Sequence, residues 1–517
     1  MTVTNVYLIC GFAAIGGGLF GLDISSMSGV LGTQAYIRYF NNPLSYRQGG
    51  ITASMPAGSF AGALASSFLA DKYSRKVTIQ IASVIWIIGA ILQTASQNVG
   101  MLCAGRVIAG LSIGIASSVV PIYQAEIAPK EIRGRIISMQ QWAITWGILI
   151  QFFIQYGASF IDGGPKNPTQ STAAFRIPWG LQMIPAFILL IGLIWFPKSP
   201  RWLASKDRWD DAVRVLADLH GKGDTSHPKV LAELQEIREV IEFERQQSTT
   251  SYQQLLEPKM ARRVFLGMSV QMWSQLSGMN VLMYYIVYVM QGAGITNPLL
   301  PSSIQYVINT VLTLPAILFV DRWGRRPTLL AGAFMMMTCL FISGSIQGAY
   351  GQPAPPGSAN TWQLINKPAQ GKAVIAVSYI FVAAFATSWG PISWTYPAEI
   401  YPSRIRAKAV SLATASCWAW NTALAFAVPP LLSSINWKMY MIFGAFNGAA
   451  FIHMFLTAPE TKGRTLEEMD EVFDTGIPAW RSNKALGGSR LDELERQIEE
   501  KQVTVEIPVV VGKEDKV

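Results

Sequence analysis

Two short stretches decide how this chain is organised: LADKYSRKVTI at residues 69–79 and FVDRWGRRPTL at residues 319–329. In each, an aspartate is followed by a basic residue, an aromatic residue, a small residue and two more basic residues. A match of this kind between distant segments indicates a chain built from two related halves.

A second pair of stretches repeats in the same order: AEIAPKEIRGR at residues 125–135 and AEIYPSRIRAK at residues 398–408. In both copies an arginine stands seven residues after the glutamate. Two related halves are a known plan of membrane transporters, which hold their substrate between the halves near the middle of the bilayer.

Long apolar blocks lie between these motifs. The 517 residues are 50% hydrophobic and only 14% charged, and the mean hydropathy is +0.29, whereas soluble domains carry about 25% charged residues. The blocks are continuous, which argues against an alternating membrane barrel, and each has close to the ~20 residues that cross a bilayer as a helix. We therefore predict twelve transmembrane helices, at residues 6–30, 50–70, 77–96, 101–123, 137–160, 178–196, 263–291, 302–320, 327–347, 373–396, 408–432 and 438–457.

The polar stretch 197–262 favours helix and separates two sets of six apolar blocks. The predicted fold class is an all-α membrane protein, with two pseudo-symmetric halves of six transmembrane helices and a cytoplasmic helical linker. Lysine and arginine concentrate in the loops on the side of this linker, which places that side and both termini in the cytoplasm. The predicted domains are an N-terminal bundle at 1–196, the linker at 197–262, a C-terminal bundle at 263–458 and a cytoplasmic tail at 459–517.

Composition also excludes several classes of function. The net charge of +9 follows from the basic loops, so we predict no nucleic-acid partner. The three histidines, His220, His227 and His453, are scattered and belong to no metal or nucleophile pattern. We therefore predict no cofactor, no metal site and no catalytic residue, and a membrane enzyme is the least favoured alternative.

Taken in order, the motifs resemble those of the sugar porters of the major facilitator superfamily. The resemblance extends through GRVIAG (105–110), PKSPRWL (197–203) and PETKG (459–463). The segment VQMWSQLSGMNVLMYY (270–285) most resembles the corresponding segment of fungal high-affinity glucose and monosaccharide transporters. The resemblance implies the major facilitator fold, a monosaccharide as the substrate, a plasma-membrane location and function as a monomer.

Three positions depart from the family pattern. Ser74 stands where the family usually has glycine, which makes a tight turn there less secure. Ser274 stands where the family usually has the first of two glutamines, so one expected amide is missing. Cys417 stands where animal facilitators usually carry asparagine, so that contact is not carried over.

A hexose is a ring of hydroxyls with two moderately apolar faces, and neutral amides with an indole suit it. Six such side chains lie inside the apolar blocks and match the sugar-contacting set of the resembled family. An alternative is that these groups only bind helix to helix, a common use of polar side chains in membranes. The predicted sugar-binding residues are Gln141, Gln275, Asn280, Asn309, Trp394 and Asn421.

Asp23 is the one charged residue of the first apolar block, and a charge at the centre of a bilayer costs on the order of 3 kcal/mol or more. The other isolated charge of that half is Arg106, so we predict that the two pair between the first and fourth helices. In the resembled family an acid at this position marks proton-coupled members. The alternative is a purely structural ion pair.

The motif charges form another predicted group. Each half repeats them at the same loop ends, which favours a shared latch that holds the cytoplasmic side closed. Solvated surface pairs worth under about 1 kcal/mol are the alternative for any single pair. The predicted latch comprises Asp71, Arg75, Glu126 and Arg133 in the first half and Asp321, Arg325, Glu399 and Arg406 in the second.

The predicted function is therefore proton-coupled uptake of a monosaccharide, with glucose as the first choice, by alternating access. Its partners are the sugar, the proton and the lipid bilayer. The alternatives are an uncoupled hexose facilitator, against which Asp23 argues, and a sugar receptor that transports little. The short tail after residue 459 argues against the receptor.

Overall fold

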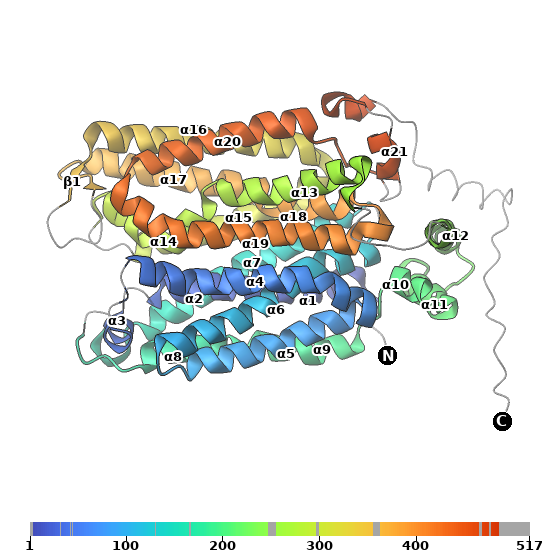
Figure 1. Cartoon of the computed structure of the whole chain (residues 1–517), viewed down its shortest axis with the longest axis horizontal. Coiled ribbons are helices and arrows are strands. Elements are labelled where there is room, and N and C mark those ends of the chain that lie inside the picture. Colours follow the sequence, from blue (N-terminus) through green and yellow to red (C-terminus); the bar gives the residue numbers. More distant parts are fainter. Residues whose placement is uncertain are drawn as a thin grey trace.

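The computed structural model is a bundle of long, roughly parallel helices (Figure 1). It describes residues 4–30, 33–41, 43, 45–129, 131–164, 167–246, 255–295, 299–354, 362–464, 468–474 and 477–484. Most of the predicted tail, from residue 485 onwards, lies outside the described residues.

The first half of the chain forms the lower part of the bundle in Figure 1, and its helices follow the first six predicted segments. A short helix, α3 (Gln34–Tyr39), lies between the first two segments. The other helices of this half are α1 (Val6–Ala13), α2 (Ile15–Ser28), α4 (Ser45–Tyr73), α5 (Arg75–Thr94), α6 (Val99–Ile127), α7 (Arg133–Ala158), α8 (Ala173–Leu181) and α9 (Met183–Gly192).

The second half forms the upper part of the bundle. Two short antiparallel strands, β1 (Gln352–Pro353) and β2 (Trp362–Gln363), follow its fourth helix. The helices of this half are α13 (Pro258–Leu276), α14 (Met279–Gly292), α15 (Leu299–Trp323), α16 (Arg325–Tyr350), α17 (Pro368–Thr387), α18 (Trp389–Ile400), α19 (Ser403–Ser434) and α20 (Lys438–Thr457).

Three helices between the halves, α10 (Pro200–Ser205), α11 (Trp209–His220) and α12 (Pro228–Gln246), lie at one end of the bundle. We call this the linker end, and the opposite end, which carries α3 and β1, the hairpin end. Two further segments follow α20: α21 (Glu468–Asp474) and a 3-10 turn, η5 (Ala479–Lys484).

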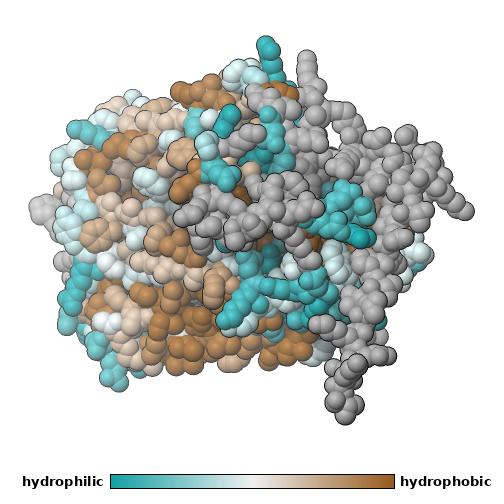
Figure 2. Space-filling view, turned by 45° about the vertical axis from the view of Figure 1, so that its right-hand side comes forward, coloured by the Kyte–Doolittle hydropathy of each residue, from teal (hydrophilic) through white to brown (hydrophobic). Residues whose placement is uncertain are grey.

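The outer surface of the bundle is apolar. Figure 2 shows brown hydrophobic side chains along the helices and teal hydrophilic ones gathered toward the two ends. Phe68, Ile184 and Ile194 are each more than half exposed, which water would penalise and lipid would not. Eight spans of the described residues are long and apolar enough to cross a membrane: 6–28, 75–94, 99–127, 173–195, 302–323, 325–350, 368–400 and 438–457.

The helix α7 falls outside those eight because it is polar on its buried side. Its four glutamines, Gln140, Gln141, Gln151 and Gln155, are at most 6% exposed and so face protein rather than lipid. A helix that lies between the two halves can carry such residues, because neighbouring helices supply the hydrogen bonds that lipid cannot.

Two of the predicted helices are broken near the middle of the bundle. The seventh is divided at Gly278, whose φ of 92° suits glycine and whose missing Cβ would lie 3.2 Å from the ring of Phe443. The tenth is divided at Ser388, slightly before the kink that Gly390 and Pro391 predict. Pro391 lies in the first turn of α18, where its missing N–H costs no helical hydrogen bond. Both breaks place side chains in the interior.

The two copies of the opening motif make the same turn. Ser74 has φ 89° and ψ 157°, and Gly324 has φ 89° and ψ 153°. This region is almost reserved for glycine, so the serine keeps the turn at a cost. The tight turn that serine made less certain is therefore present, and the Ser74 hydroxyl accepts a hydrogen bond from the Val77 amide at 3.4 Å.

The linker packs against the first half of the bundle through His220. Its Nδ1 lies 2.6 Å from the Glu233 carboxylate and its Nε2 lies 3.1 Å from the carbonyl of Ile127, the last residue of α6. Both partners are acceptors, so only the doubly protonated ring satisfies both. Burial lowers the pKa of His220, but the bond and charge of Glu233 outweigh it and raise the pKa above its usual 6.5.

The turn strain gives a first prediction. Ser74→Gly is expected to stabilise the protein by about 1 kcal/mol, because glycine adopts this conformation without strain. The measurement is the thermal unfolding midpoint of the purified protein in detergent. The matched control is Gly324→Ser, which should lower the midpoint, since a Cβ there would lie 2.7 Å from the Glu460 carboxylate. A lower midpoint for Ser74→Gly would contradict the strain.

The His220–Glu233 pair predicts a pH dependence of linker docking. The raised pKa of His220 stabilises docking fully below about pH 6.5, and this contribution is lost as the pH rises through the folded pKa. Burial raises the pKa of Glu233, but His220 outweighs it and lowers the pKa, so its contribution is lost only at acidic pH, below about 4.5. Hydrogen exchange of α11 and α12 should therefore be slower at pH 6 than at pH 8.5, after correction for intrinsic rates. His220→Gln should remove this difference, and an unchanged difference would refute the prediction.

Candidate functional site

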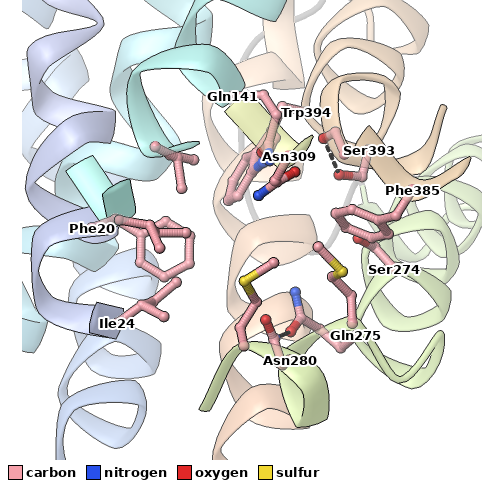
Figure 3. Close-up of a pocket in the computed structure, with 15 residues that line it drawn as sticks. Phe20, Ile24, Gln141, Ser274, Gln275, Asn280, Asn309, Phe385, Ser393 and Trp394 are labelled. Atoms are coloured by element: carbon pink, nitrogen blue, oxygen red, sulfur yellow. Dashed lines mark hydrogen bonds between the residues drawn. The ribbon is translucent and has the colours of Figure 1, made fainter. Parts of the chain in front are cut away.

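A pocket lies between the two halves, near the breaks in α13–α14 and α17–α18 (Figure 3). It contains about 450 Å³ of non-protein space, part of which is open to solvent. The lining residues are Phe20 and Ile24 from α2, Gln141, Ile144 and Ile148 from α7, Ser274, Gln275, Met279, Asn280, Met283, Asn309 and Phe385 from α13 to α17, and Gly390, Ser393 and Trp394 from α18.

Five of the six predicted sugar-binding residues line this pocket: Gln141, Gln275, Asn280, Asn309 and Trp394. The sixth, Asn421 of α19, is fully buried behind them and donates from Nδ2 to Gln275 Oε1 at 3.1 Å. Asn280 donates to the same oxygen. The structure therefore gathers the six residues, five at the pocket wall and one directly behind it.

The single polar lining residue from the first half is Gln141. Its Oε1 accepts a hydrogen bond from Trp394 Nε1 at 3.1 Å, which joins α7 to α18 at one edge of the pocket, where Figure 3 draws the two side chains next to each other. Asn309 lines the same pocket, and its buried Oδ1 atom has no hydrogen-bond partner among the described residues. A buried acceptor without a partner is costly, so a ligand hydroxyl that donates a hydrogen bond to it would recover that free energy.

Apolar residues complete the pocket, and sequence reasoning did not single them out. Ile144 and Ile148 follow Gln141 at helical spacings of three and seven residues and so share its face of α7. Phe20 faces them from α2, and its ring contacts that of Trp418 edge-on at 4.7 Å. Helical spacing from the amides could have found the isoleucines, whereas the position of Phe20 depends on tertiary packing.

Asp23 and Arg106 lie in contact in the first half, as the sequence predicts. Arg106 Nη2 is 3.2 Å from Asp23 Oδ2, and both side chains are at most 1% exposed. Arg106 Nε also donates to the Ile51 carbonyl at 3.1 Å, and the hydroxyl of Ser26 donates to the Asp23 carboxylate at 3.4 Å. Asp23 lies on the same helix, α2, as Phe20 and Ile24, which line the pocket.

The predicted latch residues form two clusters at the linker end. In the first half, Arg75 lies 3.3 Å from Asp71 and 3.1 Å from Glu126. In the second half, Arg325 lies 2.9 Å from Asp321 and 2.6 Å from Glu399. The two clusters have the same arrangement, as the repeat predicts.

The second cluster also contacts the first half. Asp321 Oδ2 accepts a hydrogen bond from the backbone amide of Arg135 at 3.0 Å, at the start of α7. At Gly134 an added Cβ would lie 2.0 Å from Arg325 Nη2, so the two halves touch there without space between them. Arg133 begins α7 and is buried, and Arg406 donates from Nε to the Tyr401 carbonyl at 3.2 Å. The linker end is closed at this contact.

The chain is similar to known proteins over nearly its whole length. The family model described as sugar (and other) transporter matches residues 9–473. The chain belongs to this sugar transporter family. It is 64% identical to the MFS glucose transporter mfs1 of Aspergillus flavus, over 96% of this chain and 94% of that protein. It is 46% identical to the high-affinity glucose transporter of Kluyveromyces lactis, over 93% of this chain and 87% of that protein.

A solved structure supports the fold. The chain superposes with a TM-score of 0.77 on the proton:xylose symporter XylE bound to 6-bromo-6-deoxy-D-glucose, at 27% identity, over 90% of this chain and 99% of that one. The protein is therefore a multi-pass membrane transporter of sugars with the major facilitator fold, and it is not an enzyme.

The two latch clusters predict different mutational costs. Arg325→Ala should destabilise the protein by about 3–5 kcal/mol, because it leaves the buried Glu399 carboxylate without its partner. Arg75→Ala also leaves a buried carboxylate, Glu126, without its ion-pair partner, but it should cost less, because Arg75 is more exposed than Arg325 and water can replace it at Asp71, which is 49% exposed. Thermal unfolding in detergent measures both variants. Equal shifts in the midpoint would contradict the difference between the clusters.

Proposed function

We propose that this transporter imports a monosaccharide together with a proton across the plasma membrane. Glucose is the first choice for that monosaccharide. The observation that carries the coupling is the buried Asp23–Arg106 pair, because Asp23 lies on the same helix as two residues of the pocket wall, Phe20 and Ile24. The relatives named above support glucose as the substrate, and the XylE structure supports proton coupling in this fold.

The pocket suits a hexose. Amides from both halves offer donors and acceptors to the ring hydroxyls, and no charged residue lines the wall among the described residues. Trp394 and Phe385 offer aromatic faces to the apolar side of the ring. A neutral polyol is therefore the ligand class that leaves the fewest groups unpaired.

The proton step follows from the burial of the pair. A buried ion pair is of small net benefit, but loss of one charge leaves the other unpaired at a cost of several kcal/mol. Protonation of Asp23 therefore changes which packing of α2 and α6 is preferred. Because an added Cβ at Gly21 would lie 2.0 Å from the Ile144 carbonyl, α2 and α7 are in direct backbone contact. A shift of α2 consequently moves the helix that carries Gln141.

The full cycle uses the closed linker end, which we assign to the cytoplasm from its basic loops. The sugar enters from the hairpin end with the proton, and its contacts to both halves favour closure over the pocket. The latch clusters then separate, and the sugar and the proton leave on the cytoplasmic side. An inward-negative membrane potential contributes about 2.3 kcal/mol per 100 mV for each charge carried.

Asp23→Asn is the direct test. In cells without their own hexose transporters, the variant should lose accumulation of labelled glucose above the external level, because it carries no proton. It should keep exchange of glucose between the two sides, since the pocket is intact. The measurements are uptake and exchange at acidic and alkaline external pH, with and without a protonophore.

The wild type is the control in the same cells, and its uptake should rise at acidic pH and fall with the protonophore. Wild-type uptake that ignores both would identify an uncoupled facilitator and overturn the coupling. A signalling response without sugar flux would identify a receptor instead.

A further inference from the structure

We propose that Cys417 is a positioning residue for sugar recognition, because it fixes the carboxamide of Gln275 so that this side chain offers the sugar a hydrogen-bond donor only. This inference rests on the proposed function in one respect, namely that Gln275 contacts the sugar. It concerns a residue outside the pocket wall and a property of the site, its hydrogen-bonding polarity, that the residue types alone do not define.

The contact itself is direct. Cys417 lies on α19 and its side chain is fully buried. Gln275 Nε2 donates to Cys417 Sγ at 3.0 Å. Cysteine sulfur accepts weakly, yet at this buried contact it satisfies an N–H group that would otherwise be buried without a partner.

The other side of the same carboxamide is also engaged. Gln275 Oε1 accepts from Asn421 Nδ2 at 3.1 Å and also from Asn280 Nδ2. Asn421 is held in turn by Tyr284, whose hydroxyl donates to Asn421 Oδ1 at 3.3 Å. Reversal of the Gln275 carboxamide would bring its NH₂ group against two amide donors and break both asparagine contacts.

The hydrogen-bonding positions of the Gln275 carboxamide determine whether it offers the sugar a donor or an acceptor. The carboxamide has two acceptor positions and two N–H groups. The two asparagines occupy both acceptor positions, and Cys417 takes one N–H. Because one N–H remains without a partner among the described residues and Gln275 lines the pocket, the side chain presents a donor alone.

The neighbouring position makes this donor more important. Ser274 also lines the pocket but carries only a short hydroxyl, so α13 provides a single amide at this wall. A sugar hydroxyl that meets Gln275 must therefore accept a hydrogen bond. Removal of that hydroxyl should weaken binding, whereas its replacement by fluorine, which accepts but cannot donate, should weaken it less.

The experiment measures equilibrium binding to the purified full-length protein, with labelled glucose displaced by the mono-deoxy and the mono-deoxyfluoro glucoses. In the wild type, one ring position should show a clear gap, with the fluoro sugar binding better than the deoxy sugar. In Cys417→Ala the Nε2 side of the Gln275 carboxamide loses its partner, so the side chain is held through Oε1 alone and its N–H is no longer aimed at one sugar hydroxyl. Glucose should then bind about three- to tenfold more weakly, the factor expected for one hydrogen bond, and the gap at that position should close.

Two further variants separate positioning from general damage. Cys417→Ser keeps an acceptor and should retain both the affinity and the gap. Cys339→Ala removes another buried cysteine, on α16, and should change neither. Thermal unfolding of each variant shows that the folded protein is being measured.

Unchanged affinity and an unchanged gap in Cys417→Ala would overturn the proposal, as would equal losses in Cys417→Ala and Cys417→Ser. Because binding is the readout, a failure of proton coupling leaves this test unaffected. Glucose binding by the wild type with no gap at any position would overturn the inferred polarity while leaving sugar transport intact.

Discussion

The ion pair between Asp23 and Arg106 is the constraint on which the rest of the first half depends. With both side chains at most 1% exposed, neither charge can be satisfied by water, so each must have the other. The pair therefore fixes α2 against α6. Because Phe20 and Ile24 extend from α2 into the pocket, the same constraint sets one wall of the site. In the proposed function, protonation of Asp23 would therefore reach the pocket through a single helix.

The two halves contribute different kinds of side chain to the pocket. The second half supplies most of the amides, and the first half supplies Gln141 and a wall of apolar side chains. Gln141 is nevertheless hydrogen-bonded to Trp394 of the second half. A ligand that occupies the pocket contacts both halves at once, so its binding energy differs between the open and closed arrangements. That difference is what a ligand needs in order to shift a conformational equilibrium.

Much of this organisation could be predicted from the sequence, because it rests on local rules. The repeated motifs predict two halves, and hydropathy predicts the helices; the isolated charges predict the Asp23–Arg106 contact. Tertiary packing determines the features that the sequence did not predict. The turn at Ser74 keeps a glycine-like conformation because the helices on both sides hold it. Asn421 lies behind the pocket wall rather than at it, and Cys417 acquires a partner only because α19 packs beside α13. No residue spacing carries that information.

The latch shows how a repeat can acquire different roles in its two copies. Both halves keep an arginine between an aspartate and a glutamate, yet the second cluster is the more deeply buried and receives the backbone of α7. The first cluster has a half-exposed aspartate and contacts the linker instead, through the Trp202 indole, which donates to the Asp71 carbonyl at 3.2 Å. Exposed ion pairs exchange with water at little cost, whereas buried ones resist separation. In the cycle proposed above, opening of the linker end must therefore break the contact between the second cluster and the backbone of α7, and sugar binding and the proton offset that cost.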